Sequence, residues 1–148
     1  IVERIVHEQL YNFFESRHLF SETQHGFRRH HSTETALITV SDSLLRSMDR
    51  SEVALLVLLD LSKCFDVVNH DKLLEKLSLY GVDHHWFNDY LVNHRQKVSF
   101  ICKHRGPLTS RALENPIGVY QGSALGPLLY TIFANDVSIH VEHGVQLL

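Results

Sequence analysis

Residues 58–70 read LLDLSKCFDVVNH, and the apolar run that enters this stretch decides the fold assignment. The run begins at Val53 and ends at Leu59, directly before Asp60. A continuous apolar run of strand length predicts a strand buried on both faces. An aspartate at the end of such a strand projects into a cleft from a fixed backbone, which suits a cation that prefers oxygen ligands, such as Mg²⁺.

Two interpretations of Asp60 remain open from its position alone. As a metal ligand, it would be joined by the turn at residues 61–64, whose backbone N–H groups can bind phosphates. As a cap, it would only satisfy the N–H groups of the turn or helix that follows the strand. Phe65 and Asp66 lie close by in the sequence, but their spacing does not separate these interpretations.

Helical periodicity and capping residues flank this stretch on both sides. They predict helices over residues 1–14, 32–49, 69–81 and 83–91, and from residue 123 onward, with Ser32, Asn69 and Asp83 as N-caps. Alternation over residues 98–102 predicts a strand with one buried face, which Gly106-Pro107 breaks, and residues 117–119 predict a short strand. This mixed order predicts an α+β fold with an antiparallel or mixed sheet packed against helices.

A glycine-rich stretch, GVYQGSALGPLL, occupies residues 118–129. Its glycines, at positions 118, 122 and 126, would let the backbone approach a ligand closely. Ser123 can open the following helix, whose N-terminus favours anions. The alternative is an ordinary glycine-rich turn that leads into a capped helix.

A basic loop, QHGFRRHH, covers residues 24–31 and runs into the helix that Ser32 caps. Contact with phosphates or with a nucleic-acid template is one interpretation. A solvated basic loop without a ligand is the other.

Composition narrows the class of protein. The 148 residues, 44% of them hydrophobic, suffice for a domain with a core. The net charge of −3 counts against nucleic-acid binding, although residues 28–31 and 97–105 are locally basic. The sequence contains no apolar run of about 18 residues and no leader-like N-terminal segment. We therefore expect an intracellular protein with no membrane span. Cys64 and Cys102 do not have the spacing of a metal-binding motif. His140 and His143 could share a helix face, but two ligands are fewer than zinc usually needs.

Taken in order, these stretches resemble the reverse transcriptase of non-long-terminal-repeat retrotransposons of the jockey, CR1 and L2 kind. Residues 24–33 are similar to the fingers motif Q-x-G-F-R-x-x-x-S-T, and residues 59–66 to the palm motif L-D-L-S-K-A-F-D. Residues 118–129 resemble G-V-P-Q-G-S-x-L-G-P-L-L, and residues 90–96 resemble Y-L-x-x-R-x-Q. The resemblance implies one partial right-hand polymerase domain, with fingers at about 1–52, a palm at about 53–148 and no thumb.

The resemblance also implies roles for single residues. Asp60 would be a ligand of two catalytic Mg²⁺ ions, with the Leu61 backbone beside metal and phosphate. Phe65 would stack under the sugar and favour deoxynucleotides, and Gln121 and Gly122 would line the incoming nucleotide. Arg28 would lie near template or nucleotide, whereas Asp66 is interpreted as structural. The partners would be an RNA template, a DNA primer and deoxynucleotides, with the protein in the nucleus during integration.

The glycine-rich stretch departs from the family pattern at one position. Tyr120 replaces a proline, which puts the geometry of the loop before Gln121 in doubt. The family's aromatic-Ala-Asp-Asp hairpin would begin near residues 145–148, and the similar-looking residues 133–136 are expected to end a helix instead. We therefore expect a polymerase segment that is inactive alone. The alternative is an inactive or host-retained remnant that at most binds nucleic acid or protein.

Overall fold

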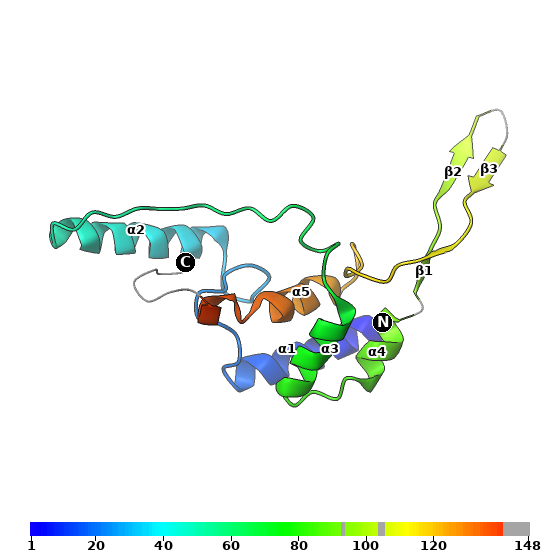
Figure 1. Ribbon diagram of the computed structural model, residues 1–148, viewed down its shortest axis with the longest axis horizontal. Coiled ribbons are helices and arrows are strands. Elements are labelled where there is room, and N and C mark those ends of the chain that lie inside the picture. The colour runs from blue at the N-terminus through cyan, green and yellow to red at the C-terminus, as the bar shows by residue number, and fades with distance from the viewer. Residues whose placement is uncertain (93, 104–105, 141–148) are drawn as a thin grey trace.

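The computed structural model describes residues 1–92, 94–103 and 106–140, in which four helices are followed by two small antiparallel sheets and a further helix (Figure 1). The helices are α1 (Val2–Ser16), α2 (Thr33–Asp49), α3 (His70–Leu79), α4 (His85–Leu91) and α5 (Gly126–Ala134), followed by a 3₁₀ helix at Val137–His140. The strands are β1 (Arg95–Gln96), β2 (Ser99–Cys102), β3 (Gly106–Thr109) and β4 (Leu113–Glu114). The α+β class is confirmed. No helix in the described ranges is long and apolar enough to cross a membrane.

The core lies between α1, α3, α4 and α5, which gather in one body from which α2 and the β2–β3 hairpin extend (Figure 1). Apolar residues three to four positions apart give each of these helices one buried stripe. The fully buried side chains of the core include Phe14, Leu73, Leu77, Leu91, Leu125, Leu129 and Ile132. Burial of each such side chain contributes about 2 kcal/mol to folding, so these four helices fix the frame on which the loops sit.

Helix ends follow the predicted capping residues closely. Asn69 Oδ1 accepts a hydrogen bond from Lys72 N at 2.9 Å, and Ser32 forms a reciprocal capping box with Thr35. The predictions at Ser32 and Asn69 succeed because a cap depends on atoms only two or three residues apart. The N-cap predicted at Asp83 is wrong by one residue, because His84 occupies that position without a side-chain cap bond. Asp83 Oδ1 still accepts a hydrogen bond from His85 N at 3.0 Å, at the first residue of α4.

The strand predicted over residues 53–59 is wrong for this structure. These residues form an extended segment without strand pairing that returns from α2 toward the core (Figure 1). Val53 is 100% exposed and Leu59 is 88% exposed. A buried strand needs neighbours for its backbone N–H and C=O groups, and the described part of the chain places none beside this segment.

The second predicted strand is present, but its surroundings differ from the prediction. β2 pairs with β3 in register Ser99↔Thr109 to Cys102↔Gly106, so Gly106 begins the partner strand rather than ending the pairing. The predicted buried face is absent, since the hairpin stands away from the core and Phe100 is 58% exposed (Figure 1).

Two further elements differ from their predicted bounds. Residues 117–119 contribute a single bridge, Asn69↔Ile117, rather than a strand. The last helix begins at Gly126, three residues after Ser123, whose Oγ accepts from Gly126 N at 2.8 Å. Residues 133–136 end that helix, as expected. His143 and residues 145–148 lie outside the described residues.

Asn135 joins three segments of the core. Its side-chain Oδ1 accepts from Ser21 N at 2.8 Å, and its Nδ2 donates to Leu19 O at 2.7 Å and to Tyr80 Oη at 2.8 Å. The residue is 8% exposed. The amide therefore satisfies backbone groups that water does not readily reach.

Asn135→Ala should lower the free energy of unfolding by about 2 kcal/mol, because it leaves buried backbone groups without partners. Urea denaturation followed by circular dichroism measures the change. Asn12→Ala, at an exposed position of α1, is the matched control and should stay within about 0.5 kcal/mol of the parent. Equal unfolding of Asn135→Ala and the parent would show that the amide network contributes nothing.

Candidate functional site

The two motif loops, residues 62–70 and 117–121, lie antiparallel and are joined through their backbones. Gly118 N donates to Val68 O at 2.7 Å, and Val119 N donates to Phe65 O at 2.8 Å. The bridge Asn69↔Ile117 continues the same pairing. The two stretches that carry the predicted site residues are thus brought together, although about fifty residues separate them in sequence. We call this pairing the loop clamp.

His70 adds a side-chain bond to the loop clamp. Its Nε2 lies 2.7 Å from Gly118 O, and the residue is 6% exposed. A carbonyl oxygen only accepts, so Nε2 carries the proton in this contact. The sequence analysis missed this residue, because its partner lies 48 positions away.

Gly118 explains how closely the two loops approach. Its φ is +89°, and a Cβ there would lie 2.9 Å from Asp66 O and 3.0 Å from Phe65 O. Only glycine fits such a contact at positive φ. The approach that the glycine permits at this position is therefore to the chain's own backbone rather than to a ligand. Gly122, with φ +83°, has no atom within 4 Å of its would-be Cβ and faces open space.

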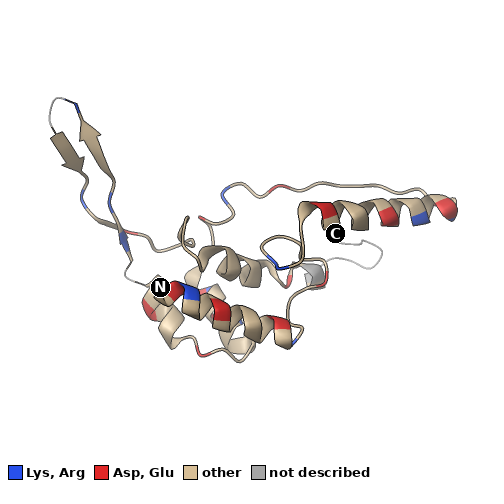
Figure 2. Ribbon diagram, turned by 180° about the vertical axis from the view of Figure 1, so that it is seen from behind, with Lys and Arg blue, Asp and Glu red and all other residues tan. Residues whose placement is uncertain are grey.

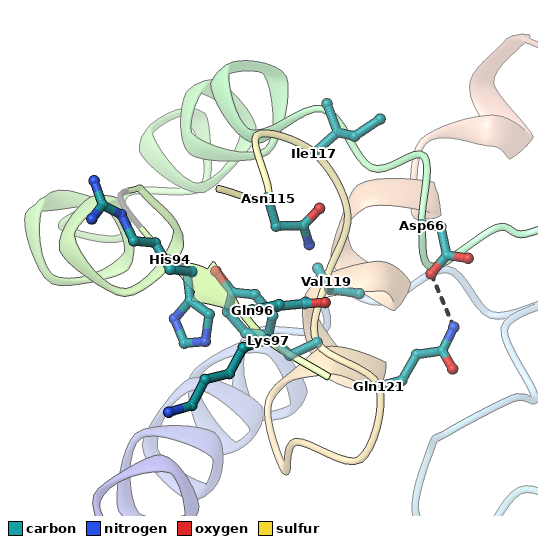
Figure 3. Close-up of a pocket in the computed structure, with 10 residues that line it drawn as sticks. Asp66, His94, Gln96, Lys97, Asn115, Ile117, Val119 and Gln121 are labelled. Carbon is teal, nitrogen blue, oxygen red and sulfur yellow. Dashed lines mark hydrogen bonds between the residues drawn. The ribbon is translucent and has the colours of Figure 1, made fainter. Parts of the chain in front are cut away.

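Gln121 and Asp66 face one another across the loop clamp. Gln121 Nε2 donates to Asp66 Oδ1 at 2.9 Å, which is the dashed contact in Figure 3. Both line a cleft of about 790 Å³. The remaining lining residues are His94, Arg95, Gln96, Lys97, Asn115, Ile117, Val119 and Tyr120. The bond to Gln121 fits the structural interpretation of Asp66.

Phe65 sits between two aromatic rings from other parts of the chain. Its ring centroid lies 4.8 Å from that of Tyr130 in α5 and 5.7 Å from that of Phe27 in the basic loop. Burial raises the pKa of Tyr130, and the neighbouring Cys64 adds to the shift. Phe65 is thereby held in place from two sides while remaining half-buried.

Asp60 lies apart from these groups. It is exposed on the extended segment, between Leu59 and Leu61, which are 88% and 65% exposed. Within the described ranges, no three His, Cys, Asp or Glu side chains cluster where they could hold a metal ion. A pair of Mg²⁺ ions needs several converging carboxylates, so the described residues do not by themselves fit that cofactor.

Arg28 points toward α1 rather than into the cleft. Its Nη2 and Nε donate to Glu15 at 3.0 and 3.3 Å, and its Nη1 donates to Ser21 O at 3.1 Å. The hydrogen bonds from Arg28 to Glu15 lower the pKa of the Glu15 carboxyl. The side chain is 12% exposed, so the structure places the guanidinium in a structural ion pair. Its contact with template or nucleotide stays a prediction.

Glu3 anchors the glycine-rich turn from α1. Its Oε2 accepts from Ala124 N at 3.0 Å and its Oε1 accepts from Tyr90 Oη at 3.1 Å. Burial, together with the nearby Glu3 carboxylate, raises the pKa of Tyr90 to about 12. The partners of Glu3 lie 87 and 121 positions away, so no local pattern announces this role.

Tyr120 stands where the family pattern has a proline, and contacts of its side chain hold it in place. Its Oη donates to Leu91 O at 3.1 Å, and its ring centroid lies 3.9 Å from that of His94. Burial raises the pKa of this tyrosine. The loop before Gln121 is therefore held by contacts to α4 and to the root of β1, where a proline would have restricted φ instead.

The family described as Reverse transcriptase (RNA-dependent DNA polymerase) matches residues 1–148 of the sequence. The chain belongs to this reverse transcriptase family. A relative, the probable RNA-directed DNA polymerase from transposon BS of Drosophila melanogaster, is 33% identical over 141 residues, which cover 91% of this chain and 15% of that protein. The RNA-directed DNA polymerase from mobile element jockey of the same organism is 32% identical over 146 residues, covering 95% and 15%.

A third relative comes from yeast. The putative COX1/OXI3 intron 1 protein of Saccharomyces cerevisiae is 29% identical over 147 residues, which cover 99% of this chain and 16% of that protein. The chain thus spans about one sixth of the length of these relatives. No solved structure matches it.

Gly118→Ala and Gly122→Ala test the loop clamp of this reverse transcriptase segment as a matched pair. Both place a side chain at positive φ, which costs about 1 kcal/mol, but only the alanine at 118 also collides with backbone. We expect Gly118→Ala to lower the free energy of unfolding by about 2 kcal/mol more than Gly122→Ala. Urea unfolding of both variants measures the difference, and equal losses would contradict the close approach.

Proposed function

We propose that the chain is the fingers and palm segment of the RNA-directed DNA polymerase of a non-long-terminal-repeat retrotransposon. Fingers would cover about residues 1–52 and the palm about residues 53–148. The observation that carries the proposal is the family match over the whole chain, and the loop clamp supports it, because it unites the two palm motifs. The full-length protein would act on an RNA template, a DNA primer and deoxynucleotides, in the nucleus during integration.

The nucleotide site is proposed to form around the loop clamp. Phe65 would pack under the sugar of the incoming deoxynucleotide, a role that its fixed, half-buried position supports. Gln121 and Gly122 would line the nucleotide, since both are exposed at the turn and Gly122 has open space beside it. The backbone of Leu61 would lie near the phosphates.

Asp60 is proposed as the one Mg²⁺ ligand that this segment contributes. Its carboxylate is the right donor type for that ion and has no hydrogen-bond or ion-pair partner within the described residues. The reaction would be attack of the primer 3′-hydroxyl on the α-phosphate, with further carboxylates supplied outside the segment. Held on an unpaired, exposed run, Asp60 requires neighbouring chain to fix its position.

Primer extension tests this proposal at Asp60. In a longer polymerase that carries this segment, Asp60→Ala should abolish extension of a primed RNA template. Asp49→Ala, which removes an exposed carboxylate at the end of α2, should extend normally. The 148-residue chain alone should extend no primer, because two-metal catalysis needs several carboxylates.

Two outcomes would contradict the proposal. Full activity of Asp60→Ala would remove the residue from the catalytic site. Extension by the isolated chain that disappears on Asp60→Ala would show that no further carboxylates are required.

A further inference from the structure

The turn that carries Gln121 and Gly122 is exposed at its tip and is held at its two ends. Both residues are exposed, and a Cβ at Gly122 would have no atom within 4 Å. Before the turn, the backbone bonds of Gly118 and Val119 join the chain to the loop clamp. After the turn, the contact comes from Glu3, in the first turn of α1. The position of the tip therefore depends on one anchor at each end.

The anchor after the turn is a hydrogen bond between a side chain and the backbone. Glu3 Oε2 accepts from Ala124 N at 3.0 Å, and Ala124 directly precedes Leu125, the N-cap of α5. A carboxylate at this place also lies near the positive end of the α5 dipole, which stabilises a negative charge. The bond from Glu3 therefore fixes, relative to α1, the point at which the turn ends and α5 begins.

α1 is a firm support for this anchor, because its apolar stripe is packed in the core. Leu10, Tyr11 and Phe14 are its buried residues. Figure 2 shows acidic positions spaced along α1 from its start at the N-terminus. Two of these acidic residues differ in their surroundings, since Glu3 is half-buried whereas Glu8 is exposed. Glu8 is therefore a matched control for Glu3 on the same helix.

Tyr90 of α4 links Glu3 to the other end of the turn. Its Oη donates to Glu3 Oε1 at 3.1 Å, and its ring lies edge-on to that of Tyr120, with the centroids 5.4 Å apart. Tyr120 directly precedes Gln121 in the sequence. Burial, together with the nearby Glu3 carboxylate, raises the pKa of Tyr90 to about 12, so the phenol keeps the proton that it donates at neutral pH. One carboxylate is thus connected to both ends of the turn.

We propose that Glu3 is a positioning residue for the nucleotide site, because it holds from α1 the turn on which Gln121 and Gly122 meet an incoming deoxynucleotide. This inference rests on the proposed polymerase function, in which those two residues line the nucleotide. Glu3 acts through the turn rather than on the reacting groups, since its two oxygens are engaged by Ala124 and Tyr90. Its loss therefore weakens nucleotide binding and leaves the chemical step unchanged.

Single-nucleotide primer extension in a longer polymerase that carries this segment measures the effect. Glu3→Ala should raise the KM for the deoxynucleotide about tenfold and leave kcat within about twofold of the parent, because it removes binding that is equal in the ground and transition states. Glu3→Gln should keep the KM within about threefold of the parent, since an amide can accept from Ala124 N and donate to Tyr90 Oη. Glu8→Ala should match the parent in both constants.

A purely structural role for Glu3 would give a different result. Loss of folded enzyme would lower kcat in proportion to the missing protein and leave the KM unchanged, and circular dichroism would show the loss directly. An unchanged KM in Glu3→Ala would therefore overturn the positioning role. Equal impairment of Glu3→Gln and Glu3→Ala would also overturn it, because the two hydrogen bonds would then not be what holds the turn.

Amide hydrogen exchange on the 148-residue chain tests the anchor without catalysis. In Glu3→Ala, the Ala124 N–H should exchange at least about tenfold faster than in the parent, whereas the core amides of α3 should exchange as before. Equal exchange at Ala124 would overturn the anchor whatever the fate of the polymerase proposal. If Asp60→Ala abolishes extension while Glu3→Ala leaves the KM unchanged, the polymerase proposal stands and this inference fails.

Discussion

The contact of Gly118 with the backbone of Phe65 and Asp66 is the constraint on which the candidate site depends. At this point two loops from distant parts of the chain approach within van der Waals distance, and the hydrogen bonds of Val68 and His70 close around the contact. Any Cβ would force the loops apart. The separation of Phe65 from the glycine-rich turn is therefore set by backbone rather than by adjustable side chains, which suits the nucleotide site proposed around these residues.

A different constraint governs the segment before the loop clamp. Residues 53–61 combine an apolar composition with exposure, and their backbone lacks the strand partners that such a composition usually implies. As a metal ligand, Asp60 would need this backbone to be held in place. The predicted site residues thus differ within the described ranges: Phe65 and Gln121 lie on loops joined through their backbones, whereas Asp60 lies on an exposed segment without strand pairing.

The contrast between correct and incorrect predictions follows the range of the interactions concerned. Caps at Ser32 and Asn69 and the helical stripes depend on neighbours within four residues, and these predictions were confirmed. The buried strand at 53–59 and the buried face of β2 depend on elements far along the chain, and these predictions were wrong. The anchoring role of Glu3 was invisible for the same reason. Motif spacing did carry long-range information, because the two motifs that contain Phe65 and Gln121 lie on loops that are joined through their backbones.

Tyr120 connects the β1–β4 pairing to the turn at residues 121–122. Its ring packs on His94, the residue before β1, while its main chain directly precedes Gln121 and its carbonyl accepts from Ser123 Oγ at 2.8 Å. The packing of His94 on this ring therefore helps to hold the residue that directly precedes Gln121. A proline at position 120 would hold the turn without any side-chain link to His94. The tyrosine thus replaces a locally rigid turn with one whose geometry depends on packing against His94 and on the hydrogen bond to Leu91 O.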